Sequence, residues 1–326
     1  MRIAAYTYLG KARFGIIEDG RIRDMGSLTD LGSIFQQIKD KKSKAGQEEK
    51  DPFLSASEVS FLASAMDPSV GERELVSVLD HLNTQDFISK DLDKADRLAF
   101  DAVTFLPPVL NPQKIICLED NYTDYCEQGG RKRPAQPRFT LKVPSALVGS
   151  GSPIMASPAM DQADYGVCLA VIIGKKGKKI PEDRANDHIS GYAIMNTISA
   201  RLVQAVGGEE RTGTADTFAP LGPYLVTREE IGDPHDLPIR CRVNGILVQE
   251  SNTSHMIFKV PQVISFLSQT MTLFPGDIIA TGTPAGVAGF QNTPGGAWLK
   301  SGDHMEAEID EIGVLKNRFL VEHKKV

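Results

Sequence analysis

The chain has 326 residues, 41% of them hydrophobic, and a formal net charge of −6. This length and apolar content are enough for one large or two unequal domains with a buried core. The negative charge argues against non-specific nucleic-acid binding, which needs a basic face. One basic cluster, "RKRP" at residues 131–134, predicts either a solvated loop, which we favour, or the capture of an anion near a functional site.

Cysteine usage and the absence of long apolar runs indicate the compartment. The four cysteines are scattered, without a CxxC pair or a spacing typical of zinc sites: Cys117, Cys126, Cys168 and Cys241. The first residues lack the apolar stretch of a signal peptide, and no run approaches the roughly 20 residues that a membrane helix needs. We therefore expect a cytoplasmic protein with reduced, buried cysteines and no membrane partner.

Residues 1–106 predict a small mixed α/β domain. The segments "RIAAYTYL" and "RFGIIEDGRIRDM" predict strands, with Asp19 and Gly20 in a hairpin turn. Apolar residues at helical spacing then predict helices over residues 28–44 and 72–83. The proline-marked link "TFLPPVLNPQ" predicts a domain boundary, so that residues 107–326 form the second domain.

After Lys114 the pattern is that of a β-rich α+β body. Short strands are predicted at "KIICL", "RFTLKV", "CLAVIIG", "YLVT", "IRCRVNGILVQ", "DIIATG" and "HMEAEIDEIGVLKNRFLVE". Helices are predicted at "ISARLVQAVG" and at "KVPQVISFLSQTM", with Pro261 near the start of the second.

The order of several motifs carries a resemblance. The segments are "IICLEDNYTDY", "RFTLKVPSALVGSGSPI", "DYGVCLAVIIGKKGKKI", "DTFAPLGPYLVT", "VNGILVQESNT" and "PGDIIATGTPAGV". From about Lys114 to Leu320 the chain resembles the fumarylacetoacetate hydrolase family. The resemblance implies a rolled mixed β-sheet body with a catalytic pocket at its mouth, a smaller N-terminal domain and a homodimer.

The resemblance also implies chemistry on 1,3-dicarbonyls, 2-oxo acids or their enols. Cleavage, decarboxylation and tautomerisation of such substrates pass through an enolate, whose charge a divalent cation stabilises. In the family this cation is usually Mg²⁺ or Mn²⁺, held by two glutamates of a Glu-x-Glu strand and by an aspartate. Many hydrolytic members add a His-Glu pair that activates water.

The residues at these positions depart from the family's pattern. The two glutamates fall on Gly166 and Cys168, and the aspartate falls on Thr197. None of these supplies an anionic oxygen, and a cysteine sulfur suits zinc or copper better than magnesium. The His-Glu pair falls on Tyr125 and Gln128. We therefore predict no metal and no other cofactor.

Several polar residues remain as site candidates. The predicted catalytic residues are Lys142, Arg201, Tyr125 and Asp124, and the predicted substrate-binding residues are Tyr122, Gln204, Thr283 and Gly282. Arg201 and Gln204 share a face if their segment is helical.

Each candidate also has a structural alternative, such as a packed tyrosine or a surface lysine. For Asp124 a turn-forming role is the favoured reading. We expect His255 to be structural or exposed, and we disfavour Cys126 with Cys168 as a nucleophilic pair.

Three functional interpretations follow. In the first, the protein is an enzyme that acts on a small dicarbonyl, 2-oxo acid or enol without metal, with Lys142 and Arg201 next to the enolate. Tyr125 or Asp124 would move the proton in a lyase, decarboxylase, isomerase or cyclase reaction. In the second, the chain is a non-catalytic ligand-binding dimer. In the third, which we favour least, a Mg²⁺-dependent acylpyruvate-type hydrolase survives with unusual ligands.

Overall fold

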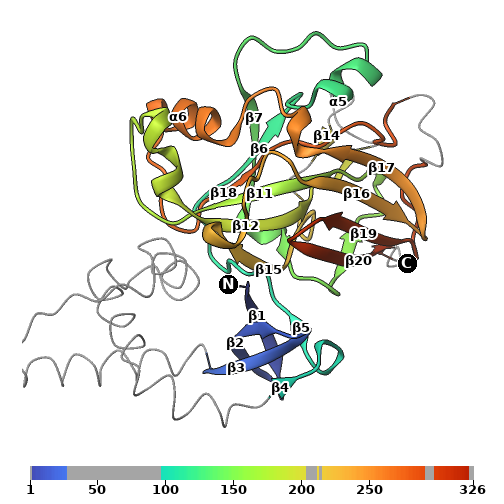
Figure 1. The fold of residues 1–326 in the computed structure, drawn as a ribbon. Coiled ribbons are helices and arrows are strands. Elements are labelled where there is room, and N and C mark those ends of the chain that lie inside the picture. The colour runs from blue at the N-terminus through green and yellow to red at the C-terminus, as the bar shows by residue number, and fades with distance from the viewer. Residues whose placement is uncertain (1, 28–96, 203–210, 213–214, 291–296, 323–326) are drawn as a thin grey trace, which may run out of the picture.

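A computed structural model describes residues 2–27, 97–202, 211–212, 215–290 and 297–322 (Figure 1). The predicted helices at residues 28–44 and 72–83 lie outside these residues. The described chain is β-rich, and its strands form three sheets. This agrees with the predicted rolled, mixed β-sheet body.

The largest sheet has 12 strands. In spatial order they are β4 (Arg97–Leu98), β3 (Arg21–Ser27), β2 (Lys11–Glu18), β1 (Arg2–Tyr8), β15 (Ala219–Thr227), β12 (Ile189–Asn196), β11 (Val167–Ile173), β18 (Ile278–Ala280), β6 (Ile115–Glu119) and β7 (Arg138–Lys142). In addition, β5 (Thr104–Phe105) pairs with β1, and β8 (Leu147–Val148) pairs with β15.

Two smaller sheets and two α-helices complete the described body. The five-stranded sheet has the order β17 (Ile246–Asn252), β16 (Pro238–Val243), β19 (His304–Ile309), β20 (Gly313–Val321) and β9 (Pro153–Ala156). The three-stranded sheet has the order β10 (Met160–Asp164), β13 (Ser199–Leu202) and β14 (Arg211–Thr212). The helices are α5 (Thr123–Gln128) and α6 (Val260–Thr270), and short 3₁₀ turns include η3 (Glu182–His188) and η5 (Thr253–His255).

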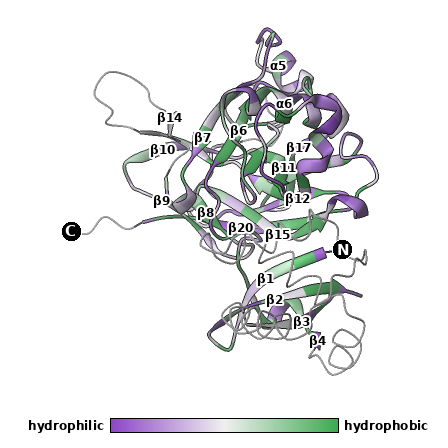
Figure 2. Cartoon of the chain, turned by 90° about the vertical axis from the view of Figure 1, so that its left-hand side faces the viewer, coloured by the Kyte–Doolittle hydropathy of each residue, from purple (hydrophilic) through white to green (hydrophobic). Residues whose placement is uncertain are grey.

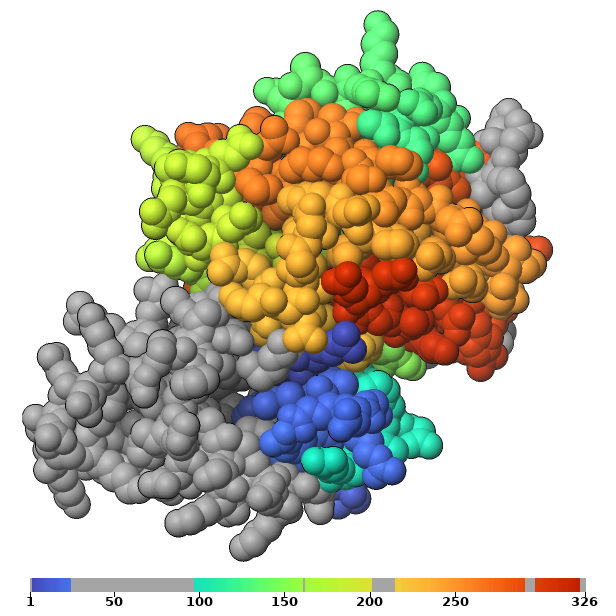
Figure 3. All heavy atoms as spheres, in the orientation of Figure 1, coloured from blue at the N-terminus to red at the C-terminus, as the bar shows by residue number. Residues whose placement is uncertain are grey.

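The N-terminal strands are connected to the rest of the large sheet by the pairing of β1 with β15. The predicted hairpin turn at Asp19 and Gly20 is confirmed, with φ values of 49° and 70°. β1 pairs with β15, with Ile3 opposite Leu225. Figure 3 shows these N-terminal strands, in blue, directly against the larger body. The division into domains at residues 1–106 and 107–326 stays a prediction.

β11 is buried on both faces, because the large sheet has apolar layers on either side. Val167, Leu169 and Val171 belong to one apolar cluster. Cys168 and Ala170, which point the other way, belong to a second. Such strands read as continuous apolar runs, and Figure 2 shows β6 and β11 in the green of hydrophobic residues. The site positions 166 and 168 therefore lie at the end of a rigid, buried strand.

One predicted helix is confirmed and the other is wrong in its described part. α6 forms at "VPQVISFLSQT", with Pro261 in its first turn. In the segment "ISARLVQAVG", residues 199–202 form the strand β13 instead, between β10 and β14. Pairing on both sides supplies the backbone hydrogen bonds that a helix would otherwise make, so tertiary context overrides the helical pattern.

A histidine side chain caps α6 and predicts a pH effect on stability. The backbone N–H of Val260 donates to Nε2 of His235 at 3.1 Å, so this nitrogen must stay unprotonated. Burial lowers the pKa of His235, and Lys259 lowers it further, while Asp233 opposes this. The stabilisation is thus complete above the ordinary pKa of about 6.5 and is lost as the pH falls through the lowered value.

We expect the free energy of unfolding to fall by about 1 kcal/mol across this range, the usual contribution of a helix cap. The measurement is urea unfolding at closely spaced pH values. His235→Ala should be less stable at pH 8 and should lose this pH dependence, whereas His304→Ala, at an exposed histidine of β19, should keep it. An unchanged pH profile in His235→Ala would contradict the assignment.

Candidate functional site

Gly166, Cys168 and Thr197, which stand at the predicted metal-ligand positions of the family, lie close together in the structure. Gly166 immediately precedes β11, and Thr197 follows β12, its neighbour in the sheet. The Thr197 hydroxyl donates to the Gly166 carbonyl at 3.0 Å, and the Gly166 N–H donates to Asn196 Oδ1 at 2.9 Å. Cys168 Sγ lies 3.6 Å from the same threonine hydroxyl.

The space in front of Gly166 is already filled. A Cβ added at this glycine would lie 2.7 Å from Thr197 Oγ1 and 3.2 Å from Thr283 Cβ. Contacts below 3 Å between such atoms force a shift. Glycine therefore fits position 166 without strain, because the two threonine side chains occupy the place where a longer side chain would begin.

Cys168 is buried and stays a thiol. Burial raises the pKa of its side chain to about 12, although the contact with the Thr197 hydroxyl lowers it. The thiol donates to the Gly166 carbonyl at 3.3 Å. A thiol held protonated in this way is a weak nucleophile and a weak metal ligand, because the thiolate is the reactive form. This agrees with disfavouring a nucleophilic role for Cys168.

Lys142 brings a positive charge to the same end of the sheet. It lies in β7 and is buried, and its Nζ donates to the backbone carbonyls of Ile198 at 2.8 Å and Phe218 at 3.1 Å. Burial lowers the pKa of Lys142, while Cys117 and Cys168 raise it, which places Lys142 within electrostatic reach of position 168. Lys142 is thus a fixed interior group and not the surface lysine of the alternative interpretation.

Gln249 of β17 holds the turn that carries Thr283. Its Nε2 donates to Thr283 Oγ1 at 3.0 Å and to the carbonyl of Pro284 at 3.0 Å, and its Oε1 accepts from the N–H of Val167 at 3.1 Å. Gly282, before this turn, has a φ of +98°, which only glycine adopts readily. One buried amide therefore ties the predicted substrate-binding turn to β11.

Helix α5 places the aromatic and acidic candidates beside this turn. Tyr122, just before the helix, is fully buried, and burial raises the pKa of its hydroxyl well above the ordinary value. Cys168 and Asp124 make smaller contributions to that shift, so Tyr122 lies within electrostatic reach of both. The ring of Tyr125 packs against Phe290, with centroids 4.7 Å apart.

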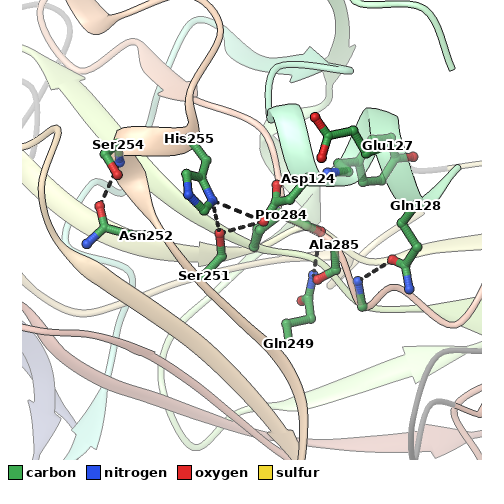
Figure 4. A network of polar contacts seen from close by, with 12 residues as sticks. Asp124, Glu127, Gln128, Gln249, Ser251, Asn252, Ser254, His255, Pro284 and Ala285 are labelled. Atoms are coloured by element: carbon green, nitrogen blue, oxygen red, sulfur yellow. Dashed lines mark hydrogen bonds and ion pairs between the residues drawn. The ribbon is translucent and has the colours of Figure 1, made fainter. Parts of the chain in front are cut away.

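Asp124 takes part in a polar cluster with two residues of the β17–η5 segment (Figure 4). Ser251 Oγ donates to Asp124 Oδ2 at 2.5 Å, and His255 Nδ1 lies 3.0 Å from Ser251 Oγ and 3.5 Å from Asp124 Oδ2. Asp124 Oδ1 accepts from the backbone N–H of Tyr125 at 2.8 Å. Asp124 is therefore more than a turn-forming residue, and His255 is not isolated on the surface.

The basic cluster at residues 131–134 is paired with acidic side chains. Arg131 makes an ion pair with Asp120 at 3.0 Å, and Arg133 pairs with Glu127 at 2.8 Å. Arg131 also lies over the ring of Tyr125, at 5.7 Å from its centroid. These contacts favour the interpretation as a solvated loop over that of an anion-binding site.

The side chains of two predicted residues, Arg201 and Gln204, are outside the described part of the structure, so their roles stay predictions. Arg201 lies in the strand β13, so the prediction that Arg201 and Gln204 share one face of a helix is wrong. Gln204 lies outside the described residues. Sequence reasoning missed Gln249 and Ser251, although their spacing of two within a predicted strand is a signal that both face the same way. It also missed the contact between His255 and Asp124.

Comparison with known proteins assigns the family. The model for the fumarylacetoacetate (FAA) hydrolase C-terminal domain matches residues 114–320. The chain belongs to the fumarylacetoacetate hydrolase family. A relative within this family, "Oxaloacetate tautomerase FAHD2B, mitochondrial" of Homo sapiens, is 43% identical over 226 residues, which cover 68% of this chain and 71% of the relative.

Solved structures of the same fumarylacetoacetate hydrolase type share the fold. A maleylpyruvate hydrolase from Sphingobium sp. SYK-6, in complex with manganese(II) ion and pyruvate, has 25% identity and a TM-score of 0.68. A 2-hydroxyhepta-2,4-diene-1,7-dioate isomerase from Mycobacterium marinum has 27% identity and a TM-score of 0.64. Each match covers 99% of this chain and 100% of the other.

The residues present here do not fit the divalent cation that the family commonly uses. Hard cations such as Mg²⁺ and Mn²⁺ need several anionic or carbonyl oxygens. The corresponding positions offer a glycine without a side chain, a buried thiol and a neutral hydroxyl that already donates to Gly166. Among the residues that the structure describes, no group of three or more His, Cys, Asp or Glu side chains is placed to hold a metal ion.

One further finding concerns the helices. Within the described ranges, no helix has both the length and the apolar content that crossing a membrane requires.

Proposed function

We propose that this member of the fumarylacetoacetate hydrolase family is an isomerase that interconverts the keto and enol forms of a 2-oxo acid or β-dicarbonyl, without a divalent cation at the family's usual position. The observation that carries the proposal is the contact of Gly166 with Thr197, because it fills the place of the family's first glutamate. The relatives named oxaloacetate tautomerase support the reaction class.

The reaction moves one proton between carbon and oxygen. A base removes a proton from the carbon next to the 2-oxo group, the electron pair shifts to form the enolate, and the carbonyl oxygen receives a proton. Nothing is oxidised, and no water is consumed. Such a reaction needs a group that exchanges protons and a positive charge near the enolate, and it can proceed without the water-activating His-Glu pair.

Two side chains of this site meet those needs. The ammonium group of Lys142, fixed by two backbone carbonyls in a buried region, supplies the positive charge in surroundings where charges act strongly. The carboxylate of Asp124, held by Ser251 and by the backbone of α5, is the base that carries the proton. Thr283, on the turn that Gln249 holds, offers a hydroxyl to the substrate carboxylate.

The test follows the decay of the enol absorbance of oxaloacetate with chelator-treated protein, with and without added Mg²⁺ or Mn²⁺. We expect catalysed decay in excess EDTA and no stimulation by metal. Decay that depends on metal would overturn the metal-free proposal. Saturable binding of oxaloacetate in calorimetry without turnover would overturn the isomerase and favour the ligand-binding alternative. Asp124→Asn is the matched catalytic control and should abolish turnover without affecting the fold.

The filled space at Gly166 can be tested by a double-mutant cycle. Gly166→Ala should lower the free energy of unfolding by about 1–3 kcal/mol, because the new Cβ overlaps with Thr197 Oγ1. The same change in a Thr197→Ala background should cost less, since the overlapping atom is gone. Urea unfolding of the four proteins measures the coupling. Equal costs in the two backgrounds would show that the two positions are independent.

A further inference from the structure

The cluster of Asp124, Ser251 and His255 connects the interior to the surface. The side chain of Asp124 is 23% exposed, and that of His255 is 50% exposed. Ser251, which touches both, is partly buried. The largely buried carboxylate of Asp124 is thus linked through the hydroxyl of Ser251 to the half-exposed imidazole of His255.

The geometry of β17 places this cluster next to the site. Gln249 and Ser251 are two residues apart, so they point to the same side of the strand, while Glu250 between them is exposed. Gln249 contacts Thr283, and Thr283 contacts the space in front of Gly166. Figure 4 shows Ser251 and His255 next to Asp124, and Gln249 beside them with its contacts to Pro284 and Ala285.

The hydrogen-bond directions are those of a proton relay. A carboxylate only accepts, so the short contact of 2.5 Å means that the Ser251 hydroxyl donates to Asp124. The remaining lone pairs of Ser251 Oγ then accept from His255 Nδ1–H at 3.0 Å. The three groups form one chain from imidazole through hydroxyl to carboxylate, in which each group can pass a proton to the next.

We infer that Ser251 and His255 form a proton relay that exchanges the proton of Asp124 with solvent. This inference rests on the proposed function, in which Asp124 carries the proton of the keto–enol reaction. When Asp124 has taken a proton from the substrate, proton exchange of the imidazole with water gives the Nε2–H tautomer, in which Nδ1 can accept. Asp124 then donates its proton to Ser251 Oγ, the serine hydroxyl donates its own to His255 Nδ1, and Nε2 releases its proton to water. The reverse sequence reloads Asp124, so that no proton is created or lost.

The relay gives Asp124 a path for proton exchange that a bound substrate does not block. A bound substrate covers a carboxylate that is already mostly buried, and proton exchange through direct contact with water then slows. A hydroxyl that links the carboxylate to a half-exposed imidazole keeps exchange possible while the substrate is in place. An imidazole is suited to this task because it has two ring nitrogens, so that it can accept a proton at one and release a proton from the other. Ser251 and His255 are positioning residues in this scheme, since they act through Asp124.

The experiment combines variants with chemical rescue. His255→Ala and Ser251→Ala should each lower the turnover of enol-oxaloacetate by about tenfold to a hundredfold, below the roughly 10²–10⁴-fold of direct acid–base catalysis, because both residues act through Asp124. Imidazole at tens of millimolar should restore His255→Ala and should not restore Ser251→Ala or Asp124→Asn. Pyrazole, a ring of similar size and much weaker basicity, is the control ligand. His304→Ala is the control variant, because this exposed histidine lies in β19, two strands away from β17 in the five-stranded sheet.

The outcomes separate the relay from the proposed function. Loss of turnover with rescue by imidazole alone supports the relay. Wild-type turnover in both His255→Ala and Ser251→Ala overturns the relay and leaves the isomerase proposal intact. Reduced turnover in His255→Ala that both rings restore, or that neither restores, assigns the histidine a structural role and also overturns the relay. Absence of turnover in the wild-type protein overturns the proposed function itself and the relay with it.

Discussion

Asp164→Ala is expected to lower the free energy of unfolding by about 3–5 kcal/mol, because it leaves three backbone N–H groups, one buried and two partly buried, without their charged acceptor. The Asp164 carboxylate is buried at the end of β10 and accepts from the backbone of Tyr165 at 2.9 Å, Ala288 at 2.8 Å and Gly289 at 2.9 Å. Hydrogen bonds to a charged acceptor are stronger than those to a neutral one.

The same substitution should also reduce turnover, since Asp164 anchors the segment directly after the Thr283 turn. Asp164→Asn keeps one acceptor oxygen and should cost less than the alanine variant. Asp183→Ala removes an exposed aspartate of η3 and should be close to neutral. Urea unfolding followed by circular dichroism measures all three. An Asp164→Ala protein as stable as the Asp183→Ala control would show that backbone relaxation or water replaces the carboxylate.

Lys142→Met is expected to cost roughly 2–4 kcal/mol of stability and to lower turnover by more than a hundredfold. Methionine has a similar length without the charge, so the carbonyls of Ile198 and Phe218 lose a donor in a buried region. The loss of turnover follows from the proposed function, in which the ammonium is the cation near the enolate.

The two effects of Lys142→Met can be separated. Its turnover is measured at a temperature where unfolding experiments show that the variant is folded, and Lys178→Met serves as the control at an exposed lysine. A folded Lys142→Met protein with wild-type turnover would remove the lysine from the chemistry and leave it a structural role. A variant with unchanged stability would show that the two carbonyls do not depend on Nζ.

Most of the body could be predicted from the sequence, because its strands carry strong local signals. The run "CLAVIIG" has to be buried on both sides, and the turns at Asp19–Gly20 and Asn244–Gly245 adopt the positive φ values that such residues favour. α6 combines an apolar stripe with proline in its first turn. The family resemblance rested on motifs in the same segments, and the match over residues 114–320 confirms it.

The altered ligand positions could also be read from the sequence, but what fills their place could not. The residue types at positions 166, 168 and 197 do not reveal that the side chains of Thr197 and Thr283 pack directly against Gly166. That contact depends on the pairing of β11 with β12 and on the path of the turn after β18. The strand at Ser199–Leu202 was missed for a related reason: its neighbours on both sides decide its conformation, against its own helical pattern.

The sequence by itself determined the fold family, part of the strands of the body and the residue types at the family's ligand positions, because each of these depends on local residue types. Only the tertiary structure decided that Lys142 is interior, that Gln249 ties the Thr283 turn to β11, and that Asp124 meets Ser251 and His255. Those contacts join residues more than 30 positions apart in the chain. Their formation depends on how α5, β17 and the large sheet pack, which residue order within any one segment does not reveal.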